Sequence, residues 1–457
     1  MSNYTLEKFL EQVKQAIYTH TLDKSLSVNP VTTKHIPLLQ PILQDYKNKQ
    51  LDSIIENYHF FNNDWPAFEI LLQKYLIYVR DFDPWSLLDS IDLLMDFYEA
   101  NSIALNNKQF NSLLFKLTYE ATKIMIPLSK LVDTKLMKVE NRVNNYPRVS
   151  YLSTVMLKAL NNLRSSPELD EKSGNPSTRY TIFVLMYVSI SLCNVYIYIG
   201  SPILCNNVFS NINVLGLDRR LVSKSQLIKY RFVLGKFHLL QSHYFEAFHH
   251  FEWCFSNCHV GSGVRILVTI LKYLIPCGLL VGKIVDTNIL RAIAANDNEG
   301  QLLVELYTPL IEHYKAGDLS RFTECVKANR QYFINMSLLV GFLQRIRILI
   351  LRNLFHNVYR MTNMLRFEDI RLALALSLNV NEQQQAGTQD LWFYLIADKV
   401  DDTLTENILM SLIDNNLIKA KLTASRNVIL RKNDSFPKIY DIYRIMYPGN
   451  SKESWLD

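Results

Sequence analysis

The stretch TENILMSLIDNNLIKAKLTASRNVILRK, residues 405–432, decides the fold of the last third of the chain. Apolar residues recur at helical spacing in its first half and predict a helix over Thr405–Asn416. Leu417–Thr423 then alternates apolar and polar residues, which predicts a strand, and Val428–Lys432 predicts its hairpin partner. A hairpin this short needs helices to pack on. Because another helix is predicted upstream, over Phe367–Leu378, the pattern is that of a winged helix.

Farther upstream, Tyr230–Cys258 has the pattern of a helix–turn–helix repeat. Gly235, Ala247 and Phe251 keep the spacing Gly-x11-Ala-x3-Phe, which is part of the tetratricopeptide (TPR) pattern. The small residues let two antiparallel helices approach closely, and the aromatic side chain fills the space against the next pair. Since a single repeat cannot bury its own apolar face, we expect stacked helical pairs from the N-terminus to about residue 335.

Two further helix boundaries can be predicted. Gly317 suits the end of a helix over Tyr307–Lys315, and Asp318 suits the N-cap of the next helix. Asp83 and Pro84 have the form of an N-cap followed by a proline at the first helical position. Both boundaries agree with a chain made of helices joined by short connections.

The predicted fold is therefore all-α: stacked TPR-like helical repeats, forming a right-handed solenoid, that end in a winged-helix subdomain with a small β-hairpin. Gly and Pro number only 13 and 14 among 457 residues, roughly half their usual share, which agrees with few turns. We expect an N-terminal helical region at 1–200, a TPR-like helical part at 201–363, a winged helix at 364–446 and a tail at 447–457.

The composition indicates an intracellular protein. Six cysteines are scattered among apolar residues, which does not indicate a disulfide framework, and the polar start of the chain does not have the form of a signal peptide. The uncharged segment Thr181–Gly200 is long enough to cross a bilayer. Its serines, tyrosines and Asn194 favour a buried core helix instead, and no basic cluster beyond Arg179 marks a membrane flank. We therefore expect no membrane insertion.

Positive charge gathers in residues 415–445, which hold seven basic and two acidic residues although the net charge of the chain is only +6. The predicted hairpin carries or adjoins five of them: Lys419, Lys421, Arg426, Arg431 and Lys432. Strand alternation points both lysines away from the core, and cations displayed together on a rigid element bind phosphates without regard to sequence. We predict that these five residues bind nucleic acid. The alternative is a solvated strand edge, kept basic against aggregation.

A second run of arginines lies in and after the apolar segment Ser337–Met361: Arg345, Arg347, Arg352, Arg360, Arg366 and Arg371. We predict a structural role for Arg352, because its helix is apolar enough to be nearly surrounded by protein. Arg366 and Arg371 have Glu368 and Asp369 nearby, and we expect these acidic residues to balance their charge.

No pattern in the chain points to catalysis. His250, Cys254 and Cys258 are spaced by four on one helix, but the outer two are about 12 Å apart along its axis, too far for one metal ion to bridge. Neither a Walker string nor HExxH nor GxSxG occurs in the sequence. We therefore predict no catalytic residue, no metal site and no cofactor, and we do not expect an enzyme.

Four strings carry a resemblance to a known family: YVRDFDPWSLLDSIDLLMDFY (78–98), RILVTILKYLIPCGLLVGKI (265–284), YKAGDLSRF (314–322) and RIRILILRNLFHNVY (345–359). Together with the order of helical pairs and winged helix, they resemble the PCI-domain subunit of the nuclear mRNA-export complex TREX-two (TREX-2). The YLIPxxLLxGK and RNLF strings are shared with a signalosome-associated paralogue, so the DPWS string carries most of the choice of branch.

The resemblance implies a function that periodicity and charge do not show. Such a protein binds a large helical scaffold subunit and a small acidic, disordered subunit of the Sem/DSS type. The assembly sits in the nucleus, at the nuclear face of nuclear pores, and its winged helices hold RNA and possibly DNA. The alternative is a PCI-domain scaffold of a signalosome-associated or other complex, which binds protein only.

Overall fold

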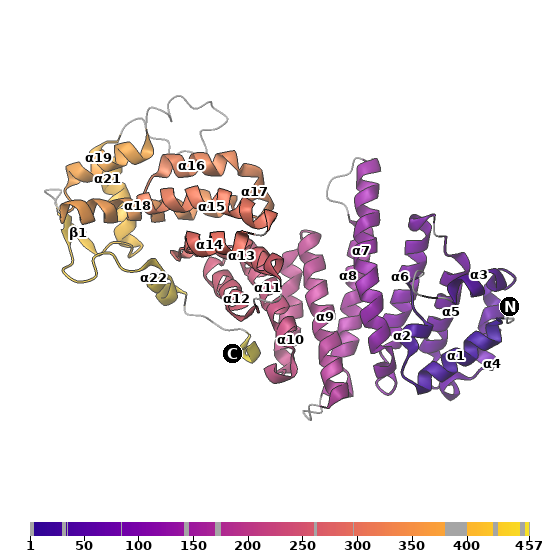
Figure 1. Ribbon diagram of the computed structural model, residues 1–457. Helices are drawn as coiled ribbons and strands as arrows, with labels where there is room; N and C mark the ends of the chain where they lie inside the picture. Colours follow the sequence, from indigo (N-terminus) through magenta and orange to yellow (C-terminus); the bar gives the residue numbers. More distant parts are fainter. Residues whose placement is uncertain are drawn as a thin grey trace. The chain divides into compact units, whose positions relative to one another are not determined.

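The computed structural model describes residues 4–29, 33, 35–83, 85–140, 146–169, 175–259, 263–295, 297–379, 400–423, 428–447 and 453–456. These residues form helices, apart from one two-stranded antiparallel sheet (Figure 1). The chain divides into two compact units: unit 1 is Met1–Tyr230 with Lys452–Asp457, and unit 2 is Arg231–Ser451. The predicted fold class, helical pairs closed by a small hairpin, is confirmed. The predicted division into four segments stays a prediction.

Unit 1 is helical throughout its described residues. Its elements are α1 (Leu6–Tyr18), α2 (Leu22–Ser25), α3 (Ile36–Leu43), α4 (Asn48–Asn57), η1 (Phe60–Asn63), α5 (Pro66–Asp81), α6 (Leu87–Ala104), η2 (Asn111–Leu114), α7 (Phe115–Glu140), α8 (Pro147–Arg164), η3 (Pro167–Leu169), α9 (Pro176–Tyr198), η4 (Pro202–Leu204), α10 (Cys205–Leu215), η5 (Arg219–Leu221), the start of α11 (Lys224–Leu240), and η8 (Ser454–Leu456). Neighbouring long helices pack on one another: α5 on α6, α7 on α8, and α8 on α9.

Large aromatic side chains fill the core of unit 1, and several of them donate to backbone carbonyls. Trp65, Tyr75 and Tyr78 are almost fully buried. The Trp65 indole donates to the carbonyl of Ala104 at 3.1 Å, and the Tyr78 hydroxyl donates to that of Val28 at 3.1 Å. Buried aromatic residues with satisfied polar atoms contribute large apolar areas without the cost of an unpaired donor.

Helix α9 contains the uncharged segment for which a membrane span was the alternative interpretation. Among the described residues, α9 and α13 (Val264–Val281) are long and apolar enough to cross a membrane. In each, 67% of the most apolar 18-residue window is buried inside the protein. Helix α9 packs on α7, α8 and α10, which supplies the apolar environment that a core helix needs. The burial favours the predicted core helix over a membrane span.

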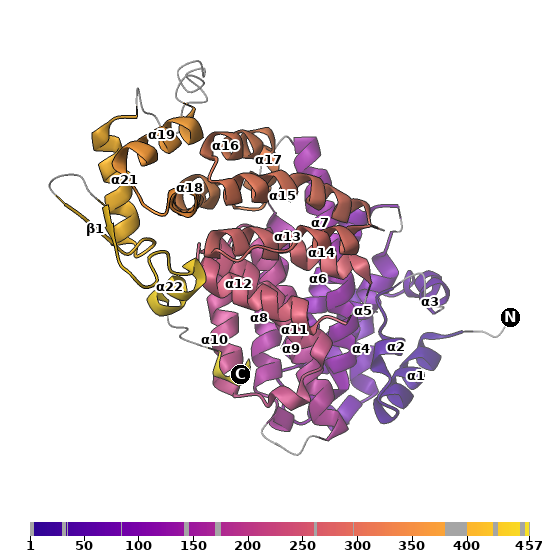
Figure 2. The ribbon, with the colours of Figure 1, turned by 60° about the vertical axis from the view of Figure 1, so that its left-hand side comes forward.

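Unit 2 contains the end of α11 and the remaining elements. These are α12 (Tyr244–Asn257), α13 (Val264–Val281), α14 (Thr287–Ala294), α15 (Asn298–Ala316), α16 (Leu319–Ala328), α17 (Arg330–Asn335), α18 (Leu339–Thr362), α19 (Phe367–Leu378), α21 (Asp402–Asp414), β1 (Ala420–Leu422), β2 (Val428–Leu430) and α22 (Ile439–Met446). Helices α15, α16 and α18 lie side by side, α19 packs on α16 and α18, and α21 packs on α19 (Figures 1 and 2).

The predicted helix–turn–helix repeat is present as α11 and α12. A Cβ atom added to Gly235 would lie 2.8 Å from Cε1 of Phe251, so only a glycine permits this approach of the two helices. The boundary predicted at Gly317 and Asp318 is also confirmed. Gly317 ends α15 with φ of +82°, and the Asp318 carboxylate accepts the amide N–H of Arg321 at 3.0 Å as the N-cap of α16.

The winged-helix part follows the predicted order of elements. Helix α19 has the predicted bounds, Phe367–Leu378. Helix α21 begins at Asp402, three residues before the predicted start, because the Asp401 carboxylate accepts the Leu404 amide at 2.8 Å and caps the helix there. The two strands are shorter than predicted, and the residues between α19 and α21 at 380–399 lie outside the described part of the chain.

The predicted helix start at Asp83 and Pro84 is wrong. Helix α6 begins at Leu87, with Ser86 in the N-cap position, while Pro84 lies outside the described residues. The Asp83 carboxylate instead accepts the amide N–H of Trp85 at 2.9 Å, and its backbone exchanges hydrogen bonds with the Ser90 hydroxyl. Asp83 therefore closes a local turn ahead of the helix, which is the competing use of a short acidic side chain.

Candidate nucleic-acid interface

The β1–β2 hairpin presents one face to the core and the other to solvent. Lys421 lies opposite Ile429 in the antiparallel register, and both side chains are exposed. The alternate residues are partly buried and pack against the hydrophobic core of unit 2: Ala420, Leu422, Val428 and Leu430. The register therefore confirms the predicted alternation, with the lysine on the solvent side.

Lys419 continues the hairpin beyond β1. Its amide N–H donates to the carbonyl of Ser435, and its carbonyl accepts the amide of Arg431, each at 2.9 Å. Its ammonium group forms an ion pair with the carboxylate of Asp434. The two side chains are 32% and 57% exposed, so the pair contributes at most about 1 kcal/mol to stability. It nevertheless offsets the charge of Lys419, which the sequence prediction did not foresee.

Three of the other predicted cations remain available. Lys421, Arg431 and Lys432 are exposed, and no ion pair joins them to another residue in the described part of the chain. Arg426, the fifth predicted residue, lies outside the described residues. The hairpin thus brings four of the five predicted residues onto one short element, with one of the four paired to an aspartate.

Arg352 of α18 fixes the segment that follows the hairpin. Its Nη2 donates to the carbonyls of Phe436 at 3.2 Å and Pro437 at 2.9 Å, and its Nη1 donates to the Asn353 side chain at 3.1 Å. The residue is only 9% exposed, and burial lowers the pKa of its guanidinium. Arg352 therefore has the structural role that was predicted, with backbone carbonyls as its partners.

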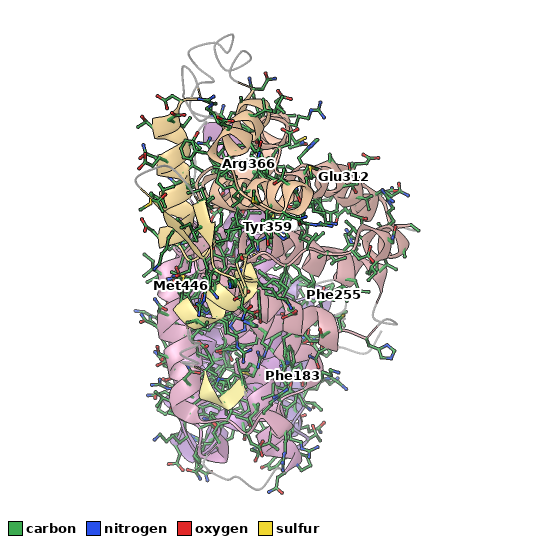
Figure 3. The ribbon with its side chains drawn as sticks, turned by 90° about the vertical axis from the view of Figure 1, so that its left-hand side faces the viewer. Phe183, Phe255, Glu312, Tyr359, Arg366 and Met446 are labelled. Carbon is green, nitrogen blue, oxygen red and sulfur yellow. The ribbon has the colours of Figure 1, made fainter. Side chains whose placement is uncertain are left out.

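Phe436 gives this attachment an apolar part. Its ring lies 5.0 Å from that of His356 and 5.5 Å from that of Tyr359, both on α18 (Tyr359 is labelled in Figure 3). Burial, followed by the charges of Arg352 and Arg360, lowers the pKa of His356. The His356 ring is therefore held toward its neutral form, so the hairpin is anchored by packing and by carbonyl hydrogen bonds.

Two asparagines complete the attachment of α18 and were missed in the sequence. The Asn353 amide donates to the carbonyl of Tyr314 at 3.0 Å, and the Asn357 amide donates to the carbonyls of Lys315 at 2.9 Å and Ala316 at 3.1 Å. These are free carbonyls at the C-terminal end of α15. Two amide side chains four residues apart in an apolar helix were the available signal. We call Arg352, Asn353 and Asn357 the α18 anchor.

The other arginines of the second basic run have separate environments. Arg371 pairs with Asp402 of α21 at 3.1 Å, so its partner is not one of the two nearby acidic residues expected from the sequence. Arg345 lies over the ring of Tyr244, 5.2 Å from its centre. Neither Arg371 nor Arg345 is therefore a freely displayed cation that would extend the hairpin surface.

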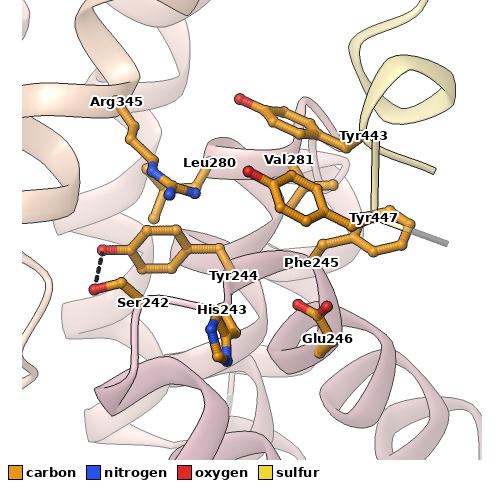
Figure 4. Close-up of a pocket in the computed structure, with 10 residues that line it drawn as sticks. All are labelled: Ser242, His243, Tyr244, Phe245, Glu246, Leu280, Val281, Arg345, Tyr443 and Tyr447. Atoms are coloured by element: carbon orange, nitrogen blue, oxygen red, sulfur yellow. Dashed lines mark hydrogen bonds between the residues drawn. The ribbon is translucent and has the colours of Figure 1, made fainter. Parts of the chain in front are cut away.

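Figure 4 shows the hollow beside Arg345, with Tyr443 of α22 and Tyr447, the residue after that helix, on the side opposite Tyr244. Its free volume is about 30 Å³. A water molecule needs roughly 10–15 Å³ of such space, and ordinary ligand pockets begin near 300 Å³. The hollow is therefore a seam between packed helices with room for a few waters.

The cysteine and histidine spacing on α12 is part of a core face. Cys254 is fully buried, and burial raises the pKa of its thiol to about 12. A thiol that binds a metal needs the opposite shift, because the thiolate is the ligand. His250 is half-buried, and burial, with the charges of His238 and Arg231, holds its pKa well below 6.5. The geometry agrees with the core role predicted for this face.

Comparison with known proteins places the chain among PCI-domain relatives, although no family model matches it. It is 25% identical over 472 aligned positions to nuclear mRNA export protein THP1 of Saccharomyces cerevisiae, which covers 98% of this chain and 99% of that protein. A PCI domain-containing protein of Schizosaccharomyces pombe is 24% identical over 94% of each chain. A CSN12 homologue of Schizosaccharomyces pombe is 28% identical over 55% of this chain and 54% of its own length.

Proposed function

Because the chain belongs to the family of PCI domain-containing proteins, we propose that it is a non-enzymatic scaffold subunit of a nuclear mRNA-export complex. The alignment with the nuclear mRNA export protein carries this proposal, because it extends over 98% of the chain and therefore includes both units. The four strings quoted above add support for the TREX-2 branch of the family.

In this proposal the two helical units provide binding surfaces for other proteins. The chain binds a large helical scaffold subunit and a small acidic, disordered subunit of the Sem/DSS type, at the nuclear face of nuclear pores. The support is the resemblance to the export-complex subunit, and the helical architecture is suited to it. Stacked helices expose long surfaces of adjacent side chains, which are typical of proteins that bind other chains along their length.

The hairpin contributes phosphate contacts to a nucleic-acid site of the complex. Support comes from Lys421, Arg431 and Lys432, which are exposed on or beside a hairpin that Arg352 and Phe436 anchor to α18. Cations on a fixed element bind phosphates without reading the base sequence. Each phosphate contact with a single strand contributes about 0.7 to the slope of log K against log salt concentration. Removal of three contacts should therefore make this slope shallower by roughly two.

The test is RNA binding by the reconstituted complex with the triple variant Lys421→Glu, Arg431→Glu, Lys432→Glu. We expect its affinity for a labelled single-stranded RNA to fall at least about tenfold in moderate salt, with a smaller salt slope. A matched control reverses three exposed lysines of unit 1: Lys108→Glu, Lys135→Glu and Lys138→Glu. Equal affinities of the two triple variants would refute a role for the hairpin.

A second candidate is a PCI-domain scaffold of a signalosome-associated complex that binds protein only. The similarity to the CSN12 homologue favours it, but that similarity covers about half of this chain. Affinity purification of the tagged chain, with identification of the bound proteins, separates the two. Export and pore components support the first proposal, and signalosome or splicing components support the second.

A further inference from the structure

The segment ahead of α6 carries a tryptophan that the protein does not bury. Trp85 is 96% exposed, whereas Trp65 and Trp455 are buried. Trp253 is the remaining described tryptophan, and the guanidinium of Arg231 lies 4.5 Å from its ring centre. Tryptophan has the largest side chain, and full exposure leaves its apolar ring in water. Packing of the fold therefore does not explain a tryptophan at position 85.

Hydrogen bonds on both sides hold the backbone at Trp85. Its amide N–H donates to the Asp83 carboxylate at 2.9 Å. The Asp83 amide donates to the hydroxyl of buried Ser90 at 3.2 Å, and that hydroxyl donates to the Asp83 carbonyl at 2.9 Å. On the other side, the Ser86 hydroxyl donates to the Asp89 carboxylate at 2.6 Å. Because the backbone is held, a partner that covers the ring loses little entropy in ordering this segment.

The surroundings of Trp85 are acidic. Residues 81–107 hold six acidic residues and no basic one. Four of the six pair with cations: Asp81 with Arg80, Asp92 with Arg148, Asp96 with Lys74 and Glu99 with Lys158. The other two, Asp83 and Asp89, form no ion pair within the described ranges, and the hydrogen bonds that they accept leave their negative charge in place. These two are the acidic residues that flank the exposed ring in the sequence.

We propose that Trp85, Asp83 and Asp89 form a docking site for an arginine-containing basic segment of a partner protein. One arginine of the segment lies flat on the indole ring, and neighbouring basic side chains pair with the two carboxylates. Tryptophan binds cations on its ring face better than other aromatic side chains, and a planar guanidinium also stacks on it. The charge of the two carboxylates is complementary to such a segment. This inference rests on the proposed scaffold function, because it assigns a surface to a protein partner.

The same charges argue against a nucleic acid or a membrane surface at this position. Both display phosphates, which two carboxylates without a counter-ion repel at short range. Sites for these ligands combine aromatic rings with lysine or arginine, and residues 81–107 contain neither cation. The hairpin has the reverse character, since residues 419–432 hold five cations and no tryptophan. The two surfaces therefore suit different partners.

The experiment uses the full chain and a fluorescein-labelled probe peptide, Arg-Ser-Arg-Gly-Arg-Ser-Arg, followed by fluorescence anisotropy. Trp85→Ala removes the ring without opening a cavity, and it should weaken binding at least about fivefold. Asp83→Asn with Asp89→Asn removes both charges but keeps an oxygen that accepts each hydrogen bond, and it should weaken binding at least about threefold. A probe with lysine in place of arginine should bind at least about twofold more weakly, because an ammonium group does not stack.

Two controls remove the same groups from α1 of the same unit. Tyr18→Ala removes another exposed aromatic ring, and Glu7→Gln with Glu11→Gln removes two exposed charges. Neither control should change the probe affinity by more than about twofold, because distant exposed charges are screened by salt. All of these variants should keep the circular dichroism spectrum and the thermal midpoint of the unmodified chain, which excludes unfolding as the cause of a loss.

Failure of the unmodified chain to bind the arginine probe, or equal binding by Trp85→Ala, overturns the inference. A dimer of the chain that Trp85→Ala dissociates in sedimentation also overturns it, because the surface then binds a second copy. A loss of RNA affinity in Trp85→Ala does the same and assigns the surface to nucleic acid.

The proposed function is tested separately. The hairpin variant Lys421→Glu, Arg431→Glu, Lys432→Glu should lose RNA and keep the probe. Recovery of signalosome components with the tagged chain would contradict the export function, whereas binding of the probe through Trp85 would still support the docking site.

Discussion

The α18 anchor and the β1–β2 hairpin place basic side chains of the same unit in opposite environments. Arg352 is 9% exposed and gives its guanidinium hydrogens to carbonyl groups, whereas Lys421 is exposed and pairs with no described residue. Both residues belong to runs of basic residues in the sequence. A run of basic residues in a sequence therefore does not by itself indicate a binding surface. The buried arginine stabilises the fold, whereas the exposed lysine is available to phosphates, and only burial and partners distinguish the two.

The largest effect is expected for Arg352→Ala. The change leaves the carbonyls of Phe436 and Pro437 without their buried donor, so we expect a loss of about 3 kcal/mol in the free energy of unfolding. Urea unfolding followed by circular dichroism measures it. Arg360→Ala, which removes an exposed arginine from the same helix, is the control and should cost less than about 0.5 kcal/mol. Equal free energies of unfolding for the two variants would mean that Arg352 contributes no more to stability than an exposed arginine, and would contradict the contrast with Lys421.

A slightly smaller effect is expected where α18 crosses the end of α15. A Cβ atom on Gly317 would lie 2.5 Å from Cα of Leu354, next to Asn353, and the residue has φ of +82°. Gly317→Ala therefore meets both a backbone clash and a strained conformation. Gly216→Ala meets only the strain, since φ is +55° and no atom lies within 4 Å. We expect Gly317→Ala to destabilise the chain by about 2 kcal/mol more than Gly216→Ala in thermal unfolding. Equal losses would mean that α18 relaxes away from the glycine.

These contacts show which features of the fold could be predicted from the sequence and which could not. The bounds of α19 and the boundary at Gly317 and Asp318 follow from local patterns, because apolar period and capping chemistry are properties of neighbouring residues. The start of α6 was misplaced because Asp83 closes a turn onto Trp85, and two local uses of one carboxylate compete. The bonds from Arg352 to residues 84 and 85 positions away depend on the path of the whole unit.

The candidate site was also predictable from the sequence only in part. Alternation along the strand predicted that Lys421 faces solvent, and the register confirms it. The pairing of Lys419 with Asp434 could not be predicted, because it depends on how the chain turns after β2. A hollow of about 310 Å³ beside the start of α11 was also missed, since it combines side chains from α7, α9 and α11 that no spacing in the sequence relates.

A third prediction uses the half-buried His250 to sharpen the contrast between enclosed and exposed basic groups. Burial, with the charges of His238 and Arg231, holds the pKa of His250 well below its ordinary 6.5. The unfolded chain therefore binds the proton first, so the stability is complete above about pH 6.5 and falls as the pH decreases below that value. His250→Gln should reduce the slope of the unfolding free energy against pH by up to about 1.4 kcal/mol per pH unit.

The measurement for His250 is the urea midpoint between pH 5 and pH 7.5, converted to free energy at each pH. The control is His243→Gln, because His243 is exposed at the start of α12. The slope, and not the absolute stability, is the quantity compared, since replacing a half-buried ring also changes packing. If both variants keep the slope of the unmodified chain, protonation of His250 does not limit acid stability.

The smallest effect is expected for Asp434→Asn, and it has the opposite sign to every other change at the hairpin. The amide cannot pair with the Lys419 ammonium, which then becomes available to a phosphate beside Lys421. The residue has φ of +58°, a conformation that Asn adopts as readily as Asp, so the backbone is not strained. We expect RNA affinity of the complex to rise about two- to threefold and stability to change by less than about 1 kcal/mol.

Asp441→Asn decides how that result is interpreted. It removes the same charge from an exposed position on α22 that forms no ion pair with the described residues, so it reports the effect of net charge alone. A rise in RNA affinity confined to Asp434→Asn means that Lys419 joins the binding surface once it is released. An equal rise in both variants means that the net charge of the protein acts on the RNA at long range. RNA affinity then does not depend on the positions of the individual cations of the hairpin.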